Sequence, residues 1–480
     1  MVNEIRKLEK TARLLEPGAA ARETLLNHAR DYAERYLAGI PETPSYCTRS
    51  DNGRALYDSP ISEEGLSIGE ALSLIHENVD TVGANPTSGR FLAYIPGGGL
   101  YHAALGDYLA AVSNRYSGVY YASQGAVRME NMLLRWMAGL IGYPDTAAGN
   151  LASGGSIANL IAIVTARDAH GIASAMIEKA VVYITGHTHH CIDKALRIAG
   201  LNGCIRKVVP VDSAGRMEAG ALDLMIRSDR ESGRVPWMIV ASAGTTNTGA
   251  VDPLSDIGEI ASARDLWFHI DGAYGALFVL CPEAKKVLRG MDRSDSIVMD
   301  PHKTLFLPYG TGAVLVKDRQ KLYASHTAGA DYMQDVVSTV EEISPADVSP
   351  ELTKHFRGLR LWLPLKILGV APFRAALSEK ILLARYFYAQ MQKKDGFEVG
   401  PYPDLSVVTF RYLPKRGDPD EFNQRLIQAI QQEGRVFLSS TRINATFVLR
   451  IAVLCFRTHL EDIDEAIDIL VNTARKLENE

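Results

Sequence analysis

The stretch SIVMDPHKTLFLPYGTG, residues 296–312, places polar side chains between an apolar run and a glycine turn. Asp300, His302 and Lys303 are its titratable residues closest to the apolar run. A lysine is rarely buried unless it has a charged partner or a chemical role. An apolar setting or a nearby cation lowers the pKa of a lysine, and the neutral amine can then form a Schiff base with an aldehyde. Lys303 is therefore a candidate nucleophile, and a surface lysine at the end of a strand is the alternative.

Similar apolar runs occur on both sides of this stretch, and helical patterns separate them. Within residues 96–375 the runs are AVVYIT (180–185), KVVPV (207–211), PWMIVASAG (236–244), LWFHIDGAYG (266–275), SIVMD (296–300) and GAVLVKD (312–318). Strands that alternate with helices predict an α/β domain with a largely parallel sheet. Ligands of such sheets bind beyond the carboxyl ends of the strands, so functional residues should directly follow these runs.

The segments before and after this region have different patterns. Residues 1–95 are mostly helical in periodicity, as in ARETLLNHARDYAERYLAGI. Residues 376–480 combine the strand-like runs LSVVTFRYL and TFVLRIAVLC with helical segments such as DEFNQRLIQAIQQEG. We therefore expect an N-terminal helical segment (1–95), a large domain (96–375) and a smaller C-terminal α+β domain (376–480).

Composition narrows the range of functions. The chain has 480 residues, of which 47% are hydrophobic and 22% charged, and its formal net charge is −5. Because the chain has no long basic run, nucleic acid and anionic membranes are poor candidates as partners. We find neither a membrane span nor the apolar core of a signal peptide. The five cysteines are never spaced as CxxC, so we expect no zinc site or disulfide framework, and a cytoplasmic location.

Two other strand ends carry residues suited to binding a charged ligand. Asp271 ends the run in FHIDGAYG, where its carboxylate needs a partner such as a pyridinium nitrogen; a helix N-cap is the alternative. Gly154, Gly155 and Ser156 lie in NLASGGSIANL, between a turn and a helical stretch. Free backbone N–H groups and a hydroxyl at a helix N-terminus suit a phosphate, although an ordinary serine-capped turn has the same sequence.

Histidine and threonine residues follow two further runs. His187, His189 and His190 lie in ITGHTHHCIDKA, without a carboxylate or Cys pattern typical of a metal site, so a histidine facing a flat cofactor ring is favoured over a metal centre. Thr245 and Thr246 follow another run and either line a pocket or form a turn. Together the strand ends supply a phosphate cradle, a stacking histidine, a ring-nitrogen carboxylate and a Schiff-base lysine, which are the groups that pyridoxal 5′-phosphate requires.

The segments SGGSIANL, HTHHCIDKA, AGTTNTGAVDPL, HIDGAYG and DPHK, in this order, resemble the group II pyridoxal-phosphate-dependent amino-acid decarboxylases. The resemblance covers nearly the whole chain. It implies the type I (aspartate-aminotransferase-like) α/β fold, with a large domain built on a mostly parallel sheet, a smaller C-terminal α+β domain and an N-terminal helical segment. It also implies a homodimer with active sites at the interface.

The resemblance also implies roles for individual residues. Lys303 would hold pyridoxal 5′-phosphate as a Schiff base, His302 would precede it, and Asp271 would pair with the ring nitrogen. His189 would stack on the ring, and Tyr332, on a catalytic loop, would reprotonate Cα. The remaining cofactor contacts would be Gly154, Gly155, Ser156, Thr246, Ala273 and Asp300. The substrate contacts would be Phe91, Tyr94, Pro96, Tyr116 and Tyr120.

Three positions refine this comparison. Tyr332 and His189 are both present, whereas related aldehyde synthases tend to replace one of them, so simple decarboxylation is favoured. Asp300 stands where animal aromatic decarboxylases tend to carry Asn, and its negative charge next to a phosphate is unexplained.

The sequence alone leaves two classes of substrate possible. An aromatic L-amino acid (tyrosine, phenylalanine, DOPA or tryptophan) is favoured by the tyrosine-rich segment RYSGVYYASQG. An acidic substrate such as glutamate or aspartate would need a cation, for which Arg90, Arg115 and Lys354 are candidates.

The sequence alone also leaves alternatives to decarboxylation possible. A pyridoxal-phosphate-dependent C–C lyase related to sphingosine-phosphate lyase would use the same cofactor for a different cleavage. A sensor would bind the cofactor without catalysis, but it would need an added DNA-binding segment, and none is visible in the sequence.

Overall fold

The computed structural model describes residues 1–47, 52–327 and 342–480. Its largest sheet has seven strands in the order β3-β9-β8-β7-β6-β4-β5. The strands are β3 (Ala148–Ala152), β4 (Ala180–Thr185), β5 (Ile205–Val209), β6 (Val235–Ser242), β7 (Trp267–Asp271), β8 (Ser296–Met299) and β9 (Gly312–Val316). β9 is antiparallel to both of its neighbours, and the other paired strands are parallel. The predicted α/β fold with a mostly parallel sheet is therefore confirmed.

Alternate residues of each strand point to opposite faces of the sheet, and helices cover both faces. On β4, Val181 and Tyr183 join one core cluster, whereas Val182 joins another. The helices that contact this sheet most closely are α5 (Gln124–Ile141), α6 (Gly155–Ala169), α8 (Ala219–Glu231), α9 (Leu254–Ala263) and α11 (Arg319–His326), and α7 (Cys191–Ile198) packs against α6. Two further helices, α4 (Tyr101–Ser113) and α12 (Arg357–Leu368), pack against each other beside it. Because most of the strands are buried on both faces, they appear in the sequence as continuous apolar runs.

The C-terminal part contains a four-stranded antiparallel sheet in the order β10-β11-β13-β12. Its elements are β10 (Phe397–Val399), β11 (Val407–Tyr412), β12 (Ser439–Ile443), β13 (Thr446–Ala452), α13 (Ala371–Met391), α14 (Pro419–Glu433) and α15 (Leu460–Asn479). The three helices and the sheet share one core cluster. The expected boundary between residues 375 and 376 lies within α13, so the division of the chain at this point stays a prediction.

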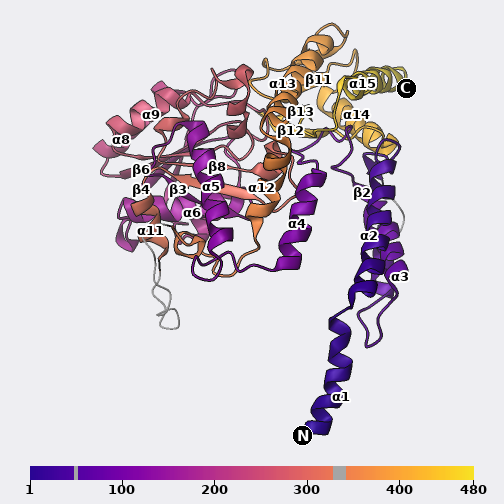
Figure 1. Ribbon diagram of the computed structural model, residues 1–480. Helices are drawn as coiled ribbons and strands as arrows, with labels where there is room; N and C mark the ends of the chain where they lie inside the picture. The colour runs from indigo at the N-terminus through magenta and orange to yellow at the C-terminus, as the bar shows by residue number, and fades with distance from the viewer. Residues whose placement is uncertain (48–51, 328–341) are drawn as a thin grey trace.

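The N-terminal part consists of α1 (Val2–Ala12), α2 (Ala19–Gly39) and α3 (Ile68–Ile75), together with a short pairing of β1 (Tyr46–Cys47) and β2 (Gly83–Ala84). None of the three helices contains a buried residue. Figure 1 shows α1 pointing away from the rest of the chain. In the described ranges, no helix has the length and apolarity needed to cross a membrane.

Candidate active site

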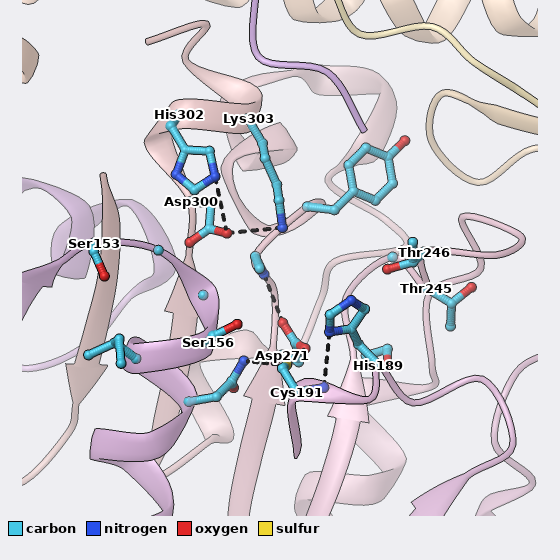
Figure 2. A pocket seen from close by; sticks show the side chains of 18 of the residues that line it. Ser153, Ser156, His189, Cys191, Thr245, Thr246, Asp271, Asp300, His302 and Lys303 are labelled. Carbon is cyan, nitrogen blue, oxygen red and sulfur yellow. Dashed lines mark hydrogen bonds and ion pairs between the residues drawn. The ribbon is translucent and has the colours of Figure 1, made fainter. Parts of the chain in front are cut away.

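A cavity of about 390 Å³ opens at the carboxyl ends of the parallel strands. Five strand ends contribute to it: Ser153–Ser156 follow β3, His187 and His189 follow β4, Thr245 and Thr246 follow β6, Asp271 ends β7, and Asp300, His302 and Lys303 follow β8 (Figure 2). β3 is separated from β8 by the antiparallel β9, so it runs in the same direction as the parallel strands. All these ends therefore meet at one edge of the sheet.

Lys303 lies in the short helix α10 (Pro301–Thr304), where Pro301 fixes the first turn. Its Nζ is 3.0 Å from Oδ2 of Asp300, and its side chain is 26% exposed. Burial lowers the pKa of Lys303, but the carboxylates of Asp300 and Asp271 outweigh burial and raise it. The prediction that the pKa of this lysine is lowered overall is therefore wrong, because the two carboxylates that share its cavity outweigh the effect of burial.

Asp271 presents a carboxylate to the cavity without an ion-pair partner among the described residues. Its Oδ1 accepts the N–H of Ala273 at 3.2 Å, and the thiol of Cys191 lies 3.9 Å from Oδ2. Neither contact neutralises its charge. A carboxylate placed in this way is suited to pair with a cationic group of a ligand, such as a protonated ring nitrogen.

His189 is oriented by its own loop. Its Nδ1 accepts the N–H of Cys191 at 3.2 Å, so a proton on the neutral ring is carried by Nε2. Burial lowers the pKa values of His189 and of His187, which also lines the cavity. The ring of His190 is tilted against that of His189, with 4.1 Å between the centroids, and His190 does not line the cavity. In the part of the chain that the structure describes, no cluster of His, Cys, Asp or Glu is arranged to hold a metal ion.

His302 and Tyr309 also line the cavity. Nδ1 of His302 is 2.6 Å from the carbonyl oxygen of Thr311, which only accepts hydrogen bonds, so this nitrogen carries the proton. Burial lowers the pKa of His302, and its ring packs edge-on against Tyr309 with the centroids 5.8 Å apart. His302 is therefore a neutral, fixed group of the cavity wall.

The start of α6 is the place where the sequence predicts a phosphate cradle. Its first residue is Gly155, and the first N–H groups of a helix have no partner within the helix. A Cβ atom at Gly155 would lie 3.2 Å from Cβ of Ala273 and 2.9 Å from Oδ2 of Asp300, so glycine keeps the cradle open. Open N–H groups, an unpaired carboxylate and a lysine amine in one cavity fit pyridoxal 5′-phosphate, which is at once a phosphate, a pyridine and an aldehyde.

The predicted substrate residues do not line this cavity: Phe91, Tyr94, Pro96, Tyr116 and Tyr120 lie elsewhere. Phe91 is buried against Phe437, and Tyr94 is 60% exposed. The hydroxyl of Tyr116 donates to the carbonyl of Leu352 at 3.4 Å, and the N–H of Tyr120 donates to Ser344 at 3.0 Å. Tyr332 lies outside the described residues. The roles of all six residues stay predictions.

Several further cavity residues were not anticipated from the sequence, among them Asn159, Cys191, Tyr274 and Tyr309. Tyr309 lies six residues after Lys303 in the same stretch, and Cys191 directly follows the histidine run, so proximity to predicted site residues was an available signal. Asn159 and Tyr274 lie in the quoted segments SGGSIANL and HIDGAYG, three residues after Ser156 and one residue after Ala273, so the same signal applied to them.

Comparisons with known proteins give a consistent result. The family model of the pyridoxal-dependent decarboxylase conserved domain matches residues 51–413. An aromatic-L-amino-acid decarboxylase of Bacillus atrophaeus is 35% identical over 418 residues, covering 86% of this chain and 87% of the relative. Tryptophan decarboxylase 2 of Oryza sativa subsp. japonica is 31% identical over 406 residues, covering 81% of each protein. The crystal structure of Oryza sativa TDC with PLP and tryptamine matches with a TM-score of 0.91 at 24% identity, over 96% of this chain and 99% of that one.

Proposed function

The chain belongs to the pyridoxal-dependent decarboxylase family, and we propose that it removes the α-carboxyl group of an aromatic L-amino acid as carbon dioxide, leaving the amine. As a member of this family it is a carboxy-lyase whose cofactor is pyridoxal 5′-phosphate. When bound, this cofactor withdraws electrons from Cα of an amino acid, so that the bond to the carboxyl group can break.

Different residues of the cavity would bind and orient the cofactor. Lys303 would bind the cofactor covalently through its amine, and the N-terminus of α6 with Gly154, Gly155 and Ser156 would hold its phosphate. Thr246 and Ala273 would line the edge and one face of the ring. These contacts would fix the ring so that the bond to be broken lies perpendicular to it.

Two side chains would control charge and protons. Asp271, which has no cation partner in the described structure, would hold a proton on the ring nitrogen by charge pairing. His189, neutral and oriented by the Cys191 N–H, would cover the other face of the ring. Tyr332 would return a proton to Cα as a general acid, with His302 as the fixed neighbour of Lys303.

A single observation favours an aromatic over an acidic substrate: Lys303 is the only Lys or Arg among the described residues that line the cavity. A side-chain carboxylate of glutamate or aspartate would need a second cation. Lys354 is paired with Glu130, and Arg90 donates to Glu465. Arg115 is exposed and outside the cavity. The names of the similar proteins, which refer to aromatic amino acids and tryptophan, support the same choice.

We further propose that the protein is a homodimer whose active sites lie at the interface. The aromatic residues expected to contact substrate do not line the cavity of their own chain, so a partner would have to supply them or its own equivalents. The N-terminal part, from α1 to the start of α2, exposes large apolar side chains, among them Leu14 and Leu15, which a second copy would cover. Sedimentation of a fully active monomer would reject this assembly.

A cytoplasmic location is also proposed. It is supported by the five cysteines, all of which are free thiols. A reducing compartment preserves such thiols.

Substrate preference is tested with the purified protein loaded with pyridoxal 5′-phosphate. Tyrosine, phenylalanine, DOPA, tryptophan, glutamate and aspartate are compared by the rate of amine formation. We expect kcat/KM for one or more aromatic substrates to exceed that for both acidic substrates by about a hundredfold or more, because a buried unpaired carboxylate is costly. Faster reaction of glutamate or aspartate would reject the proposed substrate class.

A further inference from the structure

Asp300 lines the cavity with a negative charge, and the binding of a cofactor phosphate does not explain why a negative charge is present there. Its side chain is 1% exposed, and its Oδ2 lies 3.0 Å from Nζ of Lys303 (Figure 2). Its Oδ1 is buried and has no hydrogen-bond partner in the described structure. A Cβ at Gly155 would lie 2.9 Å from Oδ2, and one at Gly312 would lie 2.6 Å from Oδ1. The carboxylate therefore occupies a slot that two glycines leave open, against the first residue of α6.

The charges of the cavity do not suit an anionic ligand as they stand. Lys303 supplies the only Lys or Arg side chain among the described lining residues, whereas Asp271 and Asp300 supply two carboxylates. Burial lowers the pKa values of the lining histidines His187, His189 and His302, so they add no positive charge near neutral pH. A phosphate at the start of α6 would lie beside Asp300, and two like charges at this distance disfavour the charged form of the carboxylate.

The resting state of Lys303 presents a second difficulty. With Asp300 and Asp271 nearby, its amine keeps its proton. A protonated amine has no lone pair and does not attack a carbonyl carbon. One transfer of a proton from Lys303 to Asp300 would remove both difficulties.

We propose that Asp300 accepts a proton from Lys303 when the cofactor phosphate enters the cradle, and that it remains a neutral carboxylic acid while the cofactor is bound. One N–H bond of the Lys303 ammonium group breaks and its electron pair stays on Nζ. One O–H bond forms on Oδ2 of Asp300, 3.0 Å away. The amine becomes a nucleophile, and the phosphate gains an uncharged neighbour. The inference rests on the proposed cofactor site and adds a role for Asp300 within it.

The decisive experiment uses pyridoxine 5′-phosphate, which carries the ring and the phosphate but no aldehyde. Infrared difference spectra are recorded when this analogue binds to the cofactor-free full-length protein. The wild type should gain the C=O stretching band of a protonated carboxylic acid. Asp300→Asn should bind the analogue without this band, and the exposed-site control Asp145→Asn should behave as the wild type.

A second measurement follows Lys303 alone. The rate of its reductive methylation in the cofactor-free protein is measured against pH by peptide mass spectrometry. Removing the Asp300 charge should shift the midpoint of this profile to lower pH. A shift of one pKa unit corresponds to a tenfold difference in the amount of neutral amine. At a fixed pH below the midpoint, Lys303 of Asp300→Asn should therefore be modified about tenfold faster than Lys303 of the wild type.

Each contrary outcome has a distinct meaning. If the wild type binds the analogue without the acid band, or if the band persists in Asp300→Asn, the proton-acceptor role of Asp300 is overturned. Identical methylation profiles would overturn the resting ion pair. Failure of the wild type to bind either pyridoxine 5′-phosphate or pyridoxal 5′-phosphate would instead reject the cofactor site, and this inference with it.

Discussion

Lys354 and Glu130 form an ion pair, with 2.9 Å between Nζ and Oε2, in which both side chains are completely buried. Lys354 also donates to the carbonyl of Leu151 on β3, at 2.9 Å, and Glu130 accepts the N–H of Gly358. β3 leads directly into the Ser153–Ser156 cradle. The pair therefore ties α5, β3 and the start of α12 together immediately below the proposed phosphate site.

Breaking this pair should strongly destabilise the protein. Glu130→Gln leaves the Lys354 ammonium buried without its counter-charge, and the expected loss in free energy of unfolding is about 3–5 kcal/mol. The double variant Glu130→Leu with Lys354→Met removes both charges and should be markedly more stable than the single variant. Urea unfolding measures all three proteins. A loss below about 1 kcal/mol for Glu130→Gln would contradict the interpretation.

Asp271→Asn should impair chemistry more than cofactor binding. Asparagine keeps the shape of the side chain but removes the charge that would hold a proton on the ring nitrogen, so kcat should fall about 10²–10³-fold. Lys303 and the cradle are unchanged, and the cofactor should remain bound. Steady-state release of carbon dioxide and the bound cofactor content are both measured, with Asp145→Asn as the charge-removal control. An unchanged kcat would show that Asp271 does not pair with the ring.

His269 should make the stability of the protein depend on pH. Burial lowers its pKa to about 4, and its ring nitrogens bond Ser296 and Asn159. As the pH falls, the unfolded chain binds a proton at this histidine before the folded protein does. The contribution of neutral His269 to the free energy of unfolding is therefore complete above about pH 6.5 and is lost as the pH falls towards about 4.

The comparison variant is His269→Gln, which cannot titrate at this position. Between about pH 7 and about pH 5, the wild type should lose about 2 kcal/mol more free energy of unfolding than the variant. Urea unfolding at the two pH values measures this difference. Equal losses in the two proteins would mean that His269 is protonated to the same extent in the folded and unfolded states.

Tyr332→Phe, outside the described residues, tests the proton donor that the resemblance assigns to the loop. The variant should bind pyridoxal 5′-phosphate as the wild type does. Its amine formation should fall about 10²–10⁴-fold, because phenylalanine has no proton to donate. Chromatography of amine and aldehyde products detects both the loss and a diversion of the reaction to aldehyde. Amine turnover at the wild-type rate would exclude Tyr332 as the donor.

The central sheet was largely predictable because most of its strands are buried on both faces. The run AVVYIT coincides with β4, Ala180–Thr185, since every one of its residues is buried. β3, Ala148–Ala152, was missed because AGNLA contains small and polar residues and only one large apolar side chain. The short β10 and the alternating, partly exposed β12 were missed because they too lack a continuous apolar run.

The candidate site residues that directly follow strands could be predicted from the sequence. Lys303, Asp271, His189 and Gly155 meet because parallel strands end at one edge, a rule that needs no coordinates. The protonation of Lys303 was not predictable in this way. It depends on the direction of the Asp300 side chain, which the glycines at 155 and 312 permit, and these glycines lie far apart in the sequence.

The central claim is that Lys303 serves a cofactor-dependent decarboxylation. It is tested most directly by loading the wild type and Lys303→Ala with pyridoxal 5′-phosphate and supplying carboxyl-labelled tyrosine or tryptophan. We expect the wild type to release labelled carbon dioxide and the amine in equal amounts. Lys303→Ala should bind the cofactor without a covalent link and release carbon dioxide at least about 10³-fold more slowly. Equal release by the two proteins, or no release from any aromatic amino acid by the wild type, would contradict the account.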